Sequence, residues 1–381
     1  MTDQTALVVG GGPGGAVAAL LLARAGYAVT VVERVAEPRA VGAGILLQPN
    51  GLAVLYGLGL RDALAVGQRV TSATISDPRG RVLLRIPTPT TADGLDHMLV
   101  LRRADLASVL YDALAAEPNV EVVFGQAVTD WRDGAVVAGA YEYHADLVIA
   151  ADGVHSLLRN AIAPGAKVKK GPTYVRAIVP IATQSDAAGE WWTELGLFGA
   201  APVDANSTYV FSSATDPELK EALAATDPAW FARRWHDVLP EAGRLFAGAT
   251  ELLVNDCDEV HAPTWVNGNA VLLGDAAHGM LPNAGQGANS AFVDAAVLVD
   301  ELRKAGLQFA LAAYAARRQP AVALVQQDAA LLARLAHLRN PAVRAARLDR
   351  GCVRRHRRAR HPARHSSFAR RTRHRVRQAG S

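Results

Sequence analysis

The chain begins with short apolar runs separated by a glycine-rich turn and a helical stretch. Ala6 to Val9 is an apolar, β-branched run, and Gly10 to Gly15 follows it as a turn. Ala16 to Ala25 has the composition of a helix, and Ala28 to Glu33 is a second β-branched run. Short apolar runs bounded by glycine are typical of buried strands. The pattern therefore predicts a strand–helix–strand unit at the N-terminus.

Two later apolar runs have the character of further buried strands. Ala145 to Ala150 ends just before Asp152, and Ala270 to Leu273 ends just before Asp275. A glycine lies next to each of these acids. Strands of a parallel sheet are buried on both faces, so their sequences are continuously apolar in this way. We expect both runs to join the sheet of the N-terminal unit.

The middle of the chain has a different pattern. From about residue 171 to residue 260, apolar and polar positions alternate in places, as in Ser207 to Ser213, and turn residues such as Pro202 and Asp204 interrupt the runs. Val70 to Pro87 has the pattern of a hairpin that turns at residues 77–80. Alternation with a period of two is typical of strands with one buried face. These segments predict a separate, mainly antiparallel β layer.

The C-terminal part has helical periodicity from Ala291 to Leu348, and we expect Pro320 and Pro341 to separate successive helices. Together the patterns predict an α/β protein, with a Rossmann-type nucleotide-binding domain, C-terminal helices and an inserted, mainly antiparallel β-sheet substrate domain. The expected boundaries are 1–69, 97–170 and 262–350 for the first domain and its helices, and 70–96 and 171–261 for the second.

Composition narrows the class of protein. The chain has 381 residues, half of them apolar, which is enough for a sizeable core. Cys257 and Cys352 have no partner at metal-ligand spacing, so we expect neither a disulfide framework nor a metal site. Glycines and Pro13 interrupt the uncharged stretch from Gln4 to Ala23, which argues against a membrane span, and no basic segment precedes it. A cytoplasmic protein is therefore expected.

The net charge of +4 hides an uneven distribution. Residues 351–381 hold eleven Arg and no Asp, Glu or Lys, which leaves −7, that is +4 minus 11, for residues 1–350. Such a basic tail is compatible with an arm that binds nucleic acid or another anionic surface. The abrupt change of composition after Arg350 is also that of a frame-shifted end. We favour a disordered tail without function, and expect no nucleic-acid partner.

The glycine turn carries the first chemical motif. Gly10, Gly12 and Gly15 form a GxGxxG pattern between a predicted strand and a predicted helix. Glycines there let the backbone approach a pyrophosphate at the helix N-terminus. Glu33 ends the second strand, where a carboxylate accepts hydrogen bonds from a ribose diol and favours FAD or NAD over NADP. The alternative is a tight turn and a solvated strand end without a ligand.

Two further motifs complete the pattern. One is Asp152-Gly153-Val154-His155-Ser156-Leu157-Leu158-Arg159. The other is Gly274-Asp275-Ala276-Ala277-His278, followed by Pro282 and by Gly285-Gln286-Gly287-Ala288-Asn289. With the glycine turn, in this order and spacing, the chain resembles the FAD-dependent aromatic hydroxylases. These are the group A flavoprotein monooxygenases, which include p-hydroxybenzoate hydroxylase and salicylate hydroxylase. The resemblance extends from about Thr5 to Leu335.

The resemblance implies an activity and its partners. It implies an FAD-dependent monooxygenase that uses NADPH or NADH and O2 to hydroxylate or epoxidise a small aromatic or polyketide-like substrate through a flavin C4a-hydroperoxide. It implies a Rossmann-type FAD-binding domain, and we expect a monomer or a homodimer. Three alternatives remain: a flavin-dependent halogenase, an FAD-dependent reductase of an isoprenoid-like substrate, and a flavin redox sensor without turnover. Trp191 and Trp192 are adjacent, which does not match the halogenase pattern.

The same resemblance, together with the motifs, assigns the cofactor site. Asp275 would hold the ribityl hydroxyls, and Asp152 with Gly153 would lie near the pyrophosphate, although Asp152 is equally well explained as a helix cap. The loop from Pro282 to Asn289 would point its amide groups at the flavin pyrimidine ring. The residues assigned to FAD are Gly10, Gly12, Gly14, Gly15, Glu33, Arg34, Arg39, Arg103, Asp152, Gly153, Gly274, Asp275, Pro282, Gly285, Gly287 and Asn289.

The catalytic residues are less well defined. Hydroxylation of a phenol is helped by a base and needs a pocket that excludes water. The candidates have no partner at a fixed sequence spacing, and they are His97, Tyr174, Arg176, Tyr209, His236 and His261. Salicylate-hydroxylase-like proteins have a Trp-Arg-Gly element where this chain has Tyr174 to Ile178. A simple salicylate is therefore not the expected substrate.

Overall fold

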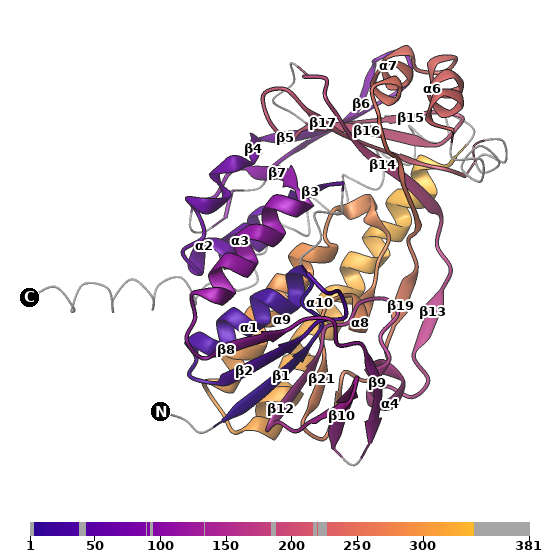
Figure 1. Cartoon of the computed structure of the whole chain (residues 1–381). Coiled ribbons are helices and arrows are strands. Elements are labelled where there is room, and N and C mark those ends of the chain that lie inside the picture. Colours follow the sequence, from indigo (N-terminus) through magenta and orange to yellow (C-terminus); the bar gives the residue numbers. More distant parts are fainter. Residues whose placement is uncertain are drawn as a thin grey trace, which may run out of the picture.

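A computed structural model describes residues 4–37, 43–88, 90–91, 94–132, 134–183, 188–215, 219 and 227–338. Figure 1 shows two layers: a sheet with helices packed on it, which contains the N-terminal strand, and a second sheet above it that carries two short helices. The predictions for Arg39, for Pro341 and for the basic tail fall on residues outside this description.

The first sheet is built from the predicted N-terminal strands and the two later apolar runs. Its strand order is β20-β21-β12-β1-β2-β8, and only the pair β20–β21 is antiparallel. This arrangement confirms the predicted Rossmann-type strand–helix–strand unit. The strands are β1 (Thr5–Val9), β2 (Ala28–Val32), β8 (Val120–Val123), β12 (Leu147–Ala150), β20 (Val266–Asn267) and β21 (Ala270–Leu272).

Helices and small sheets surround this sheet. Helix α1 is buried along most of its length because apolar residues occupy nearly every position after its first turn. The helices are α1 (Pro13–Arg24), α2 (Pro49–Gly57), α3 (Arg103–Ala115), α4 (Leu158–Ile162), α8 (Asp275–His278), α9 (Gly287–Leu302) and α10 (Leu307–Ala336), with the 3-10 turns η1 (Ala63–Val66) and η2 (Pro282–Ala284). The small sheets consist of β3 (Gly44–Leu47), β7 (Met98–Arg102) and β4 (Gln68–Val70), and of β11 (Tyr141–Tyr143), β10 (Ala135–Ala138) and β9 (Val128–Arg132).

The second sheet has seven strands in the order β18-β14-β17-β16-β15-β5-β6, and only β15 and β5 pair in parallel. The hairpin expected from Val70 to Pro87 is present as β5 and β6 and joins this sheet, as predicted. The strands are β5 (Ser72–Ser76), β6 (Val82–Pro87), β14 (Thr173–Val179), β15 (Ala188–Trp192), β16 (Leu197–Pro202), β17 (Thr208–Ser213) and β18 (Leu253–Asp256). The ribbon of β13 (Lys167–Lys169) and β19 (Glu259–His261) leads toward it.

The two faces of the seven-stranded sheet have different neighbours. Alternate residues of a strand point to opposite faces. Val175 and Val210 face helices α6 (Pro228–His236) and α7 (Pro240–Ala247), and form one apolar core with them. Tyr174, Arg176 and Ile178 lie on the opposite face of β14, which is directed at the remainder of the molecule.

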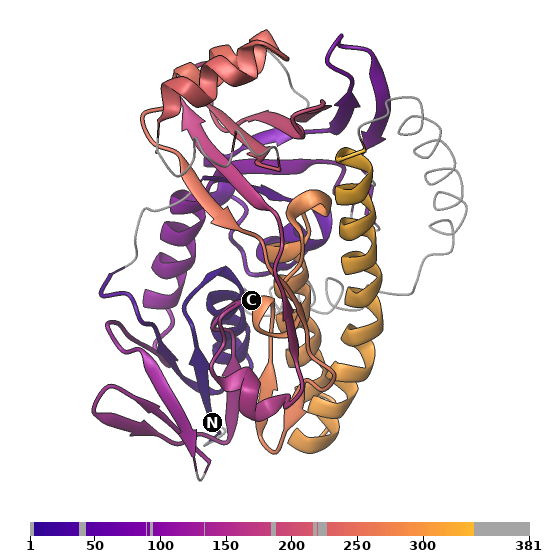
Figure 2. The same cartoon turned by 90° about the vertical axis from the view of Figure 1, so that its right-hand side faces the viewer.

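Helix α10 corrects one expectation from the sequence, because Pro320 lies inside it and does not divide it. Pro320 is exposed, whereas Tyr314 and Val322 on either side of it are buried. A proline on the solvent side removes a backbone bond where a helix tolerates curvature, so packing of the flanking turns keeps the helix continuous. Figure 2 shows α10 running along one side of the molecule from the first layer to the second. Among the described residues, no helix has both the length and the apolar character required of a membrane span.

Candidate functional site

The glycine turn lies at the carboxyl end of β1, and its two flanks are closely packed. A Cβ atom at Gly10 would lie 2.5 Å from the Ala151 carbonyl oxygen, and one at Gly15 would lie 1.9 Å from the Gly10 oxygen. Gly12 differs, because a Cβ atom there would meet nothing within 4 Å. The turn is therefore locked against β12 on one side and open at Gly12 on the other.

Helix α1 begins at this open side with unsatisfied amide groups. Gly12 is its N-cap residue and offers no side chain for capping, Pro13 follows, and the first turn has no acidic residue. The first amide groups of a helix have no partner inside the helix, and the helix dipole favours an anion there. An open, glycine-lined helix start of this kind fits a pyrophosphate group.

Glu33 braces the turn from the neighbouring strand. Its carboxylate accepts hydrogen bonds from the Gly11 amide at 2.6 Å and the Val35 amide at 3.0 Å. Tyr111 donates its hydroxyl proton to the Gly11 carbonyl at 2.9 Å, and burial, followed by the charge of Glu33, raises the pKa of Tyr111 to about 12. The carboxylate of Glu33 thus already accepts hydrogen bonds from two backbone amides. Because it is partly exposed and has further lone pairs, it can also accept hydrogen bonds from a ribose.

The predicted arginines lie at the surface. Arg34 and Arg103 are exposed, and the backbone amide of Arg103 donates to the Ala43 carbonyl at 3.1 Å. Arg103 therefore begins helix α3 next to the segment that precedes β3. The position of Arg39 lies outside the described residues.

Asp152 and Gly153 follow strand β12 at the same sheet edge. One carboxylate oxygen of Asp152 accepts from the Leu157 amide at 3.0 Å, while the other is buried without a partner among the described residues. Burial raises the pKa of Asp152. Gly153 has φ +80°, with nothing within 4 Å of a built Cβ atom. Asp152 thus caps the start of the following segment and also retains a free oxygen, so the capping and cofactor interpretations are compatible.

Buried Arg159 connects this segment to the next motif. Its guanidinium donates to the Val154 carbonyl at 2.7 Å and to the Ala276 carbonyl at 3.2 Å. Gly274 takes a positive φ of +63°, and Asp275 opens α8 with an exposed side chain. An Asp275 oxygen lies 3.8 Å from the position of a Cβ atom at Gly287, where α9 begins. An exposed carboxylate thus lies beside a second helix N-terminus.

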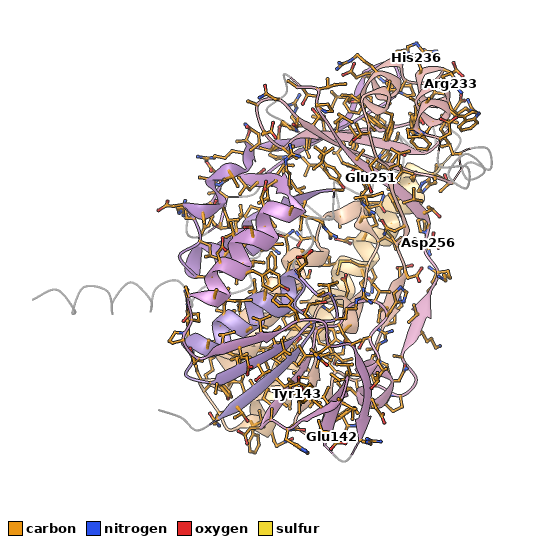
Figure 3. All side chains as sticks on the ribbon, viewed as in Figure 1. Glu142, Tyr143, Arg233, His236, Glu251 and Asp256 are labelled. Atoms are coloured by element: carbon orange, nitrogen blue, oxygen red, sulfur yellow. The ribbon has the colours of Figure 1, made fainter. Side chains whose placement is uncertain are left out.

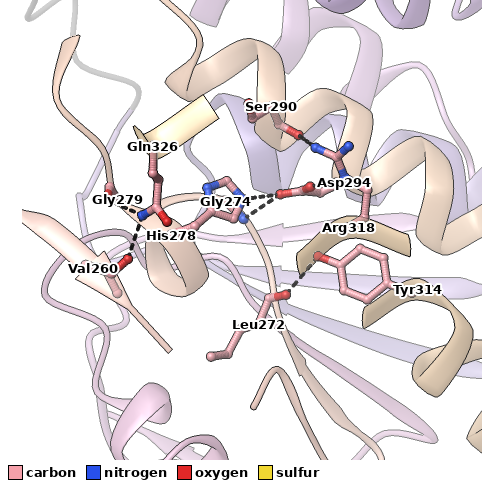
Figure 4. A network of polar contacts seen from close by, with 10 residues as sticks. All are labelled: Val260, Leu272, Gly274, His278, Gly279, Ser290, Asp294, Tyr314, Arg318 and Gln326. Carbon is pink, nitrogen blue, oxygen red and sulfur yellow. Dashed lines mark hydrogen bonds and ion pairs between the residues drawn. The ribbon is translucent and has the colours of Figure 1, made fainter. Parts of the chain in front are cut away.

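A buried ion network supports this turn from behind (Figure 4). Asp294, which is fully buried on α9, accepts from the Gly274 amide at 3.2 Å, from His278 Nε2 at 2.5 Å and from Arg318 Nε at 2.6 Å. Burial alone would raise the pKa of Asp294, but His278 and Arg318 outweigh it and lower the pKa overall. Trp265 packs on the His278 ring, with centroids 5.2 Å apart. Asp294 thus connects the Gly274–Asp275 turn to α9 and α10.

A second network, made of amide side chains, joins β3 to the loop before α9. Buried Asn289 accepts from the Gln48 amide at 2.9 Å and donates to the carbonyl groups of Leu46 at 3.1 Å and Gly285 at 2.9 Å. Gln48 also donates to the Ala284 carbonyl at 2.8 Å. The side chain of Asn289 is therefore occupied with backbone groups and holds together two segments that the sequence predicts to lie along the cofactor.

These features form a donor set that fits a dinucleotide. Open helix starts at Gly12 and Gly287, a buried Asp152 oxygen without a partner and exposed Asp275 lie at the carboxyl edge of one parallel sheet. Amide groups at helix starts suit phosphates, and carboxylates suit sugar hydroxyls. Dinucleotides bind at this edge in open α/β sheets.

Comparison with known proteins identifies the family. A family model described as an FAD binding domain matches residues 3–329. The chain is 33% identical over 330 residues to the aurachin C monooxygenase/isomerase of Stigmatella aurantiaca, covering 83% of this chain and 85% of that protein. It is 34% identical over 353 residues to the 3-amino-4-hydroxybenzoate 2-monooxygenase of Streptomyces cremeus, covering 88% of each. The chain belongs to the FAD-dependent aromatic-hydroxylase family of monooxygenases.

A solved structure agrees with this assignment. An HpxO variant of Klebsiella pneumoniae, complexed with FAD, superposes with a TM-score of 0.77 at 25% identity, covering 90% of this chain and 93% of that one. The protein is therefore an FAD-dependent monooxygenase, for which NADH or NADPH serves as co-substrate. The sequence-based predictions of family, fold class, enzyme class and cofactor are confirmed.

In this monooxygenase, three of the predicted catalytic candidates lie together on the inner face of the seven-stranded sheet. Tyr174 donates to the Asn283 side chain at 2.7 Å, which connects the sheet to the η2 turn. Arg176 donates to Asn255 and, at 3.3 Å, to the sulfur of Cys257, and its charge also acts on the Tyr209 hydroxyl. Burial, the largest influence, raises the pKa of Tyr209 although Arg176 lowers it, so its hydroxyl keeps its proton at neutral pH.

Tyr209 also contacts the segment that precedes α2. A Cβ atom at Gly44 would lie 2.4 Å from the Tyr209 ring, so the ring packs directly on the backbone of β3. Strand β3 is the one that Asn289 fastens to the loop before α9. The inner face of the seven-stranded sheet therefore approaches the candidate cofactor edge both at β3 and at η2.

The histidine candidates lie elsewhere. His97 is buried against Tyr56, 3.4 Å from its hydroxyl, with Arg69 and Asp96 on its other ring nitrogen. Figure 3 shows His236 at the outer end of α6, on the side of the sheet away from β3, and His261 is exposed on β19. None of these three interacts with Tyr174, Arg176 or Tyr209 in any contact of the described residues.

Other site residues were not foreseen from the sequence. The clearest example is Asp294, a charged residue within the largely apolar helix α9, where such residues are rarely buried unless they are paired or functional. This departure from the apolar pattern is the feature of the sequence that could have indicated a structural or functional role. The partner Arg318 lies 24 residues away in the sequence, so the role of Asp294 could not be inferred from spacing.

The first prediction concerns the two kinds of glycine in the turn. Gly12→Val places methyl groups into the open space over the α1 start, where backbone angles of −61° and 173° accept any residue. We expect the fraction of protein that contains FAD to fall at least about tenfold. The unfolding free energy of the flavin-free protein should change by less than about 1 kcal/mol. Gly15→Ala should lose FAD and several kcal/mol of stability together, because its Cβ atom meets backbone. Flavin absorbance measures the FAD content and thermal unfolding measures the stability of each variant. Normal flavin content in Gly12→Val would contradict the assignment of the glycine turn to FAD binding.

The second prediction concerns the buried network. Asp294→Asn removes the negative charge that compensates Arg318, and it can place an amide NH2 group against the donors of Gly274 and Arg318. We therefore expect the unfolding free energy to fall by roughly 3–5 kcal/mol, and FAD to be retained less well. Asp300→Asn is the matched control on the same helix, where surface contacts to Lys304 and Arg317 are worth under about 1 kcal/mol. Denaturant titration distinguishes them, and equal effects in the two variants would refute a special role for Asp294.

The third prediction uses Glu190, whose pKa burial raises from 4.5 to about 7. The carboxyl group of Glu190 therefore holds its proton more tightly in the folded state than in the unfolded state. Its ionisation lowers the unfolding free energy progressively as the pH rises from 4.5 to about 7, and the whole destabilisation is present above pH 7. Glu190→Gln should therefore leave unfolding nearly unchanged below pH 4.5 and stabilise the protein above pH 7. After allowance for its partial exposure we expect on the order of 2 kcal/mol. A stability difference that is independent of pH would exclude this explanation.

Proposed function

We propose that this monooxygenase inserts an oxygen atom from O2 into a small aromatic or polyketide-like molecule held between the seven-stranded sheet and FAD, by hydroxylation or epoxidation. The observation that carries the proposal is the inner face of that sheet, where Arg176 and Tyr209 lie among aromatic and apolar side chains and Tyr209 packs on β3. A relative of 34% identity is named for a reaction on an aminohydroxybenzoate, which agrees with an aromatic substrate.

The residues proposed to hold FAD are those of the carboxyl sheet edge. The amide groups around Gly12 and Gly14 would receive the pyrophosphate, Glu33 a ribose, and Asp275 the ribityl chain. The amide groups at Gly287 would face the ring. When bound, FAD supplies the redox chemistry, accepting a hydride from NADH or NADPH and reducing O2. Residues 1–69, 97–170 and 262–350 would form this domain and its helices, and 70–96 and 171–261 the substrate domain.

The chain's own groups would orient the substrate and exclude water. Arg176 would bind an oxygen substituent of the ring, and the protonated Tyr209 hydroxyl would donate a hydrogen bond to that oxygen and stabilise a developing phenolate. Tyr174, fixed to Asn283, would hold the sheet against the η2 turn. Leu46 and Ile178 surround Tyr209 with apolar surface, which keeps water from the reacting centre.

The sequence supports expectations about the cellular compartment, the oligomeric state and nucleic-acid binding. We infer that the protein acts in the cytoplasm as a monomer or a homodimer and binds no nucleic acid. Support comes from the scarcity of cysteine and from the negative charge of residues 1–350. Removal of residues 351–381 should leave the monooxygenase activity intact.

The fourth prediction tests the function on the FAD-loaded enzyme. Candidate hydroxyaromatic and aminoaromatic compounds are supplied with NADH or NADPH and isotopically labelled O2. We expect one compound to accelerate NAD(P)H oxidation at least about tenfold and to gain a labelled oxygen atom. Repeated product formation without O2 would favour an isoprenoid-type reductase. Flavin reoxidation that releases only hydrogen peroxide, whatever compound is present, would favour a redox sensor.

A further inference from the structure

One row of residues crosses the inner face of the seven-stranded sheet. The strand register places Arg176 opposite Phe211, Phe211 opposite Gly199, and Gly199 opposite Glu190. Residues that are directly opposite one another in neighbouring strands point to the same face. The row therefore consists of a cation, an aromatic ring, a position without a side chain and a carboxyl group.

The aromatic ring covers the glycine position. A Cβ atom at Gly199 would lie 2.1 Å from the Phe211 ring, so the ring lies over the backbone of β16. The Tyr209 ring is next to it, with centroids 5.3 Å apart and planes inclined by 33°. Phe211 and Tyr209 are both only partly buried. Together they form an aromatic surface between the cation and the carboxyl group.

Glu190 is partly buried, and it has fewer partners than a carboxyl group with reduced access to water normally has. Its one hydrogen bond among the described residues comes from the Trp192 indole at 3.0 Å. That bond uses one carboxyl oxygen, and no described cation pairs with the group. Burial is the cause that raises its pKa to about 7. Carboxyl groups with reduced access to water are normally paired, so a partly buried glutamate with a single hydrogen bond is a candidate for a functional residue.

Arg176 does not serve as that partner. The two residues are three strands apart, which corresponds to roughly 14 Å between their backbones. Arg176 is also engaged with Asn255 and Cys257 on the opposite side of β14. Tyr174 lies beside Arg176 on β14, and the Arg176 guanidinium carbon is 5.5 Å from the centroid of its ring. The opposite charges are thus held apart on one face, with an aromatic surface between them.

We propose that Glu190 is a specificity residue that accepts a hydrogen bond from a ring N–H or amino group of the substrate, while Arg176 and Tyr209 bind an oxygen substituent on the opposite edge of the same ring. The ligand class is a planar aromatic amine or nitrogen heterocycle that carries its donor and its acceptor across the ring. This inference rests on the proposed function, because it describes the substrate of the same site.

Such a ligand would satisfy each unusual feature of the row. The flat ring would stack on the Phe211 surface, and offset stacking of aromatic rings is favourable. Its nitrogen proton would provide the missing partner of the Glu190 oxygen. A site built to hydrogen-bond a polar group discriminates strongly against analogues that lack it, because the buried group is then left without a partner.

The fifth prediction compares ligands that differ only in the donor. The FAD-loaded enzyme is titrated with 4-quinolone and 1-methyl-4-quinolone, and with 3-aminobenzoate and 3-dimethylaminobenzoate, without NAD(P)H, while flavin absorbance is followed. We expect at least one N–H ligand to bind at least about tenfold more tightly than its methylated partner. Glu190→Leu should remove this preference with little change for the methylated compound, and Glu190→Gln should retain part of it, because an amide oxygen still accepts.

Exposed Glu194, in the turn after β15, supplies the matched control, and Glu194→Gln should preserve the preference. Equal binding of both members of each pair, survival of the preference in Glu190→Leu, or failure of both pairs to bind would each overturn the proposal. Flavin content and unfolding are measured for every variant, so that loss of fold is recognised. Because no turnover is required, failure of oxygenation would count against the proposed function alone.

Discussion

The buried carboxylate of Asp294 makes the interactions on which the candidate cofactor edge depends. It lies at the meeting point of the Gly274 turn, helix α9 and helix α10, and it bonds one group from each of the turn, α8 and α10. A charge in this position is tolerated because Arg318 and His278 compensate the loss of hydration. Without it the amide of Gly274 would be buried without an acceptor. The geometry of Asp275 and of the α9 start therefore depends on a residue that is itself inaccessible to a ligand.

The two layers are connected by polar contacts as well as by separate apolar clusters. Tyr174 reaches the η2 turn through Asn283. Tyr209 packs on β3, which Asn289 and Gln48 in turn fix to the loop before α9. Apolar contacts of α10 with the seven-stranded sheet, through Leu335 and neighbouring residues, add a third connection. Hydrogen bonds are directional, so these contacts set the position of the inner face of the seven-stranded sheet more precisely than apolar packing alone. Arg176 and Tyr209 are thereby directed at the cofactor edge.

Several polar groups at this junction lack the partners that burial demands. One oxygen of Asp152 is buried without a partner among the described residues, and Glu190 has a single hydrogen bond. The start of α1 at Gly12 presents amide groups into open space. Polar groups without partners destabilise the ligand-free protein. The presence of each such group is explained if a bound ligand supplies its missing partner. This is the physical link between the sequence motifs and a protein that binds both a cofactor and a substrate.

The sequence alone was sufficient to predict the family, the fold class and the cofactor. The glycines of the turn, Glu33 and the Gly274–Asp275 pair act through the backbone next to them, so local spacing contains the information. Only the tertiary structure brought Arg176, Phe211 and Glu190 into one row, because pairing between β14, β17, β16 and β15 joins residues from separate segments. It likewise showed that Pro320 does not end a helix, since packing on both sides of it outweighs the local preference. Local motifs therefore indicated which cofactor binds, whereas long-range strand pairing decided which side chains share the inner face of the seven-stranded sheet.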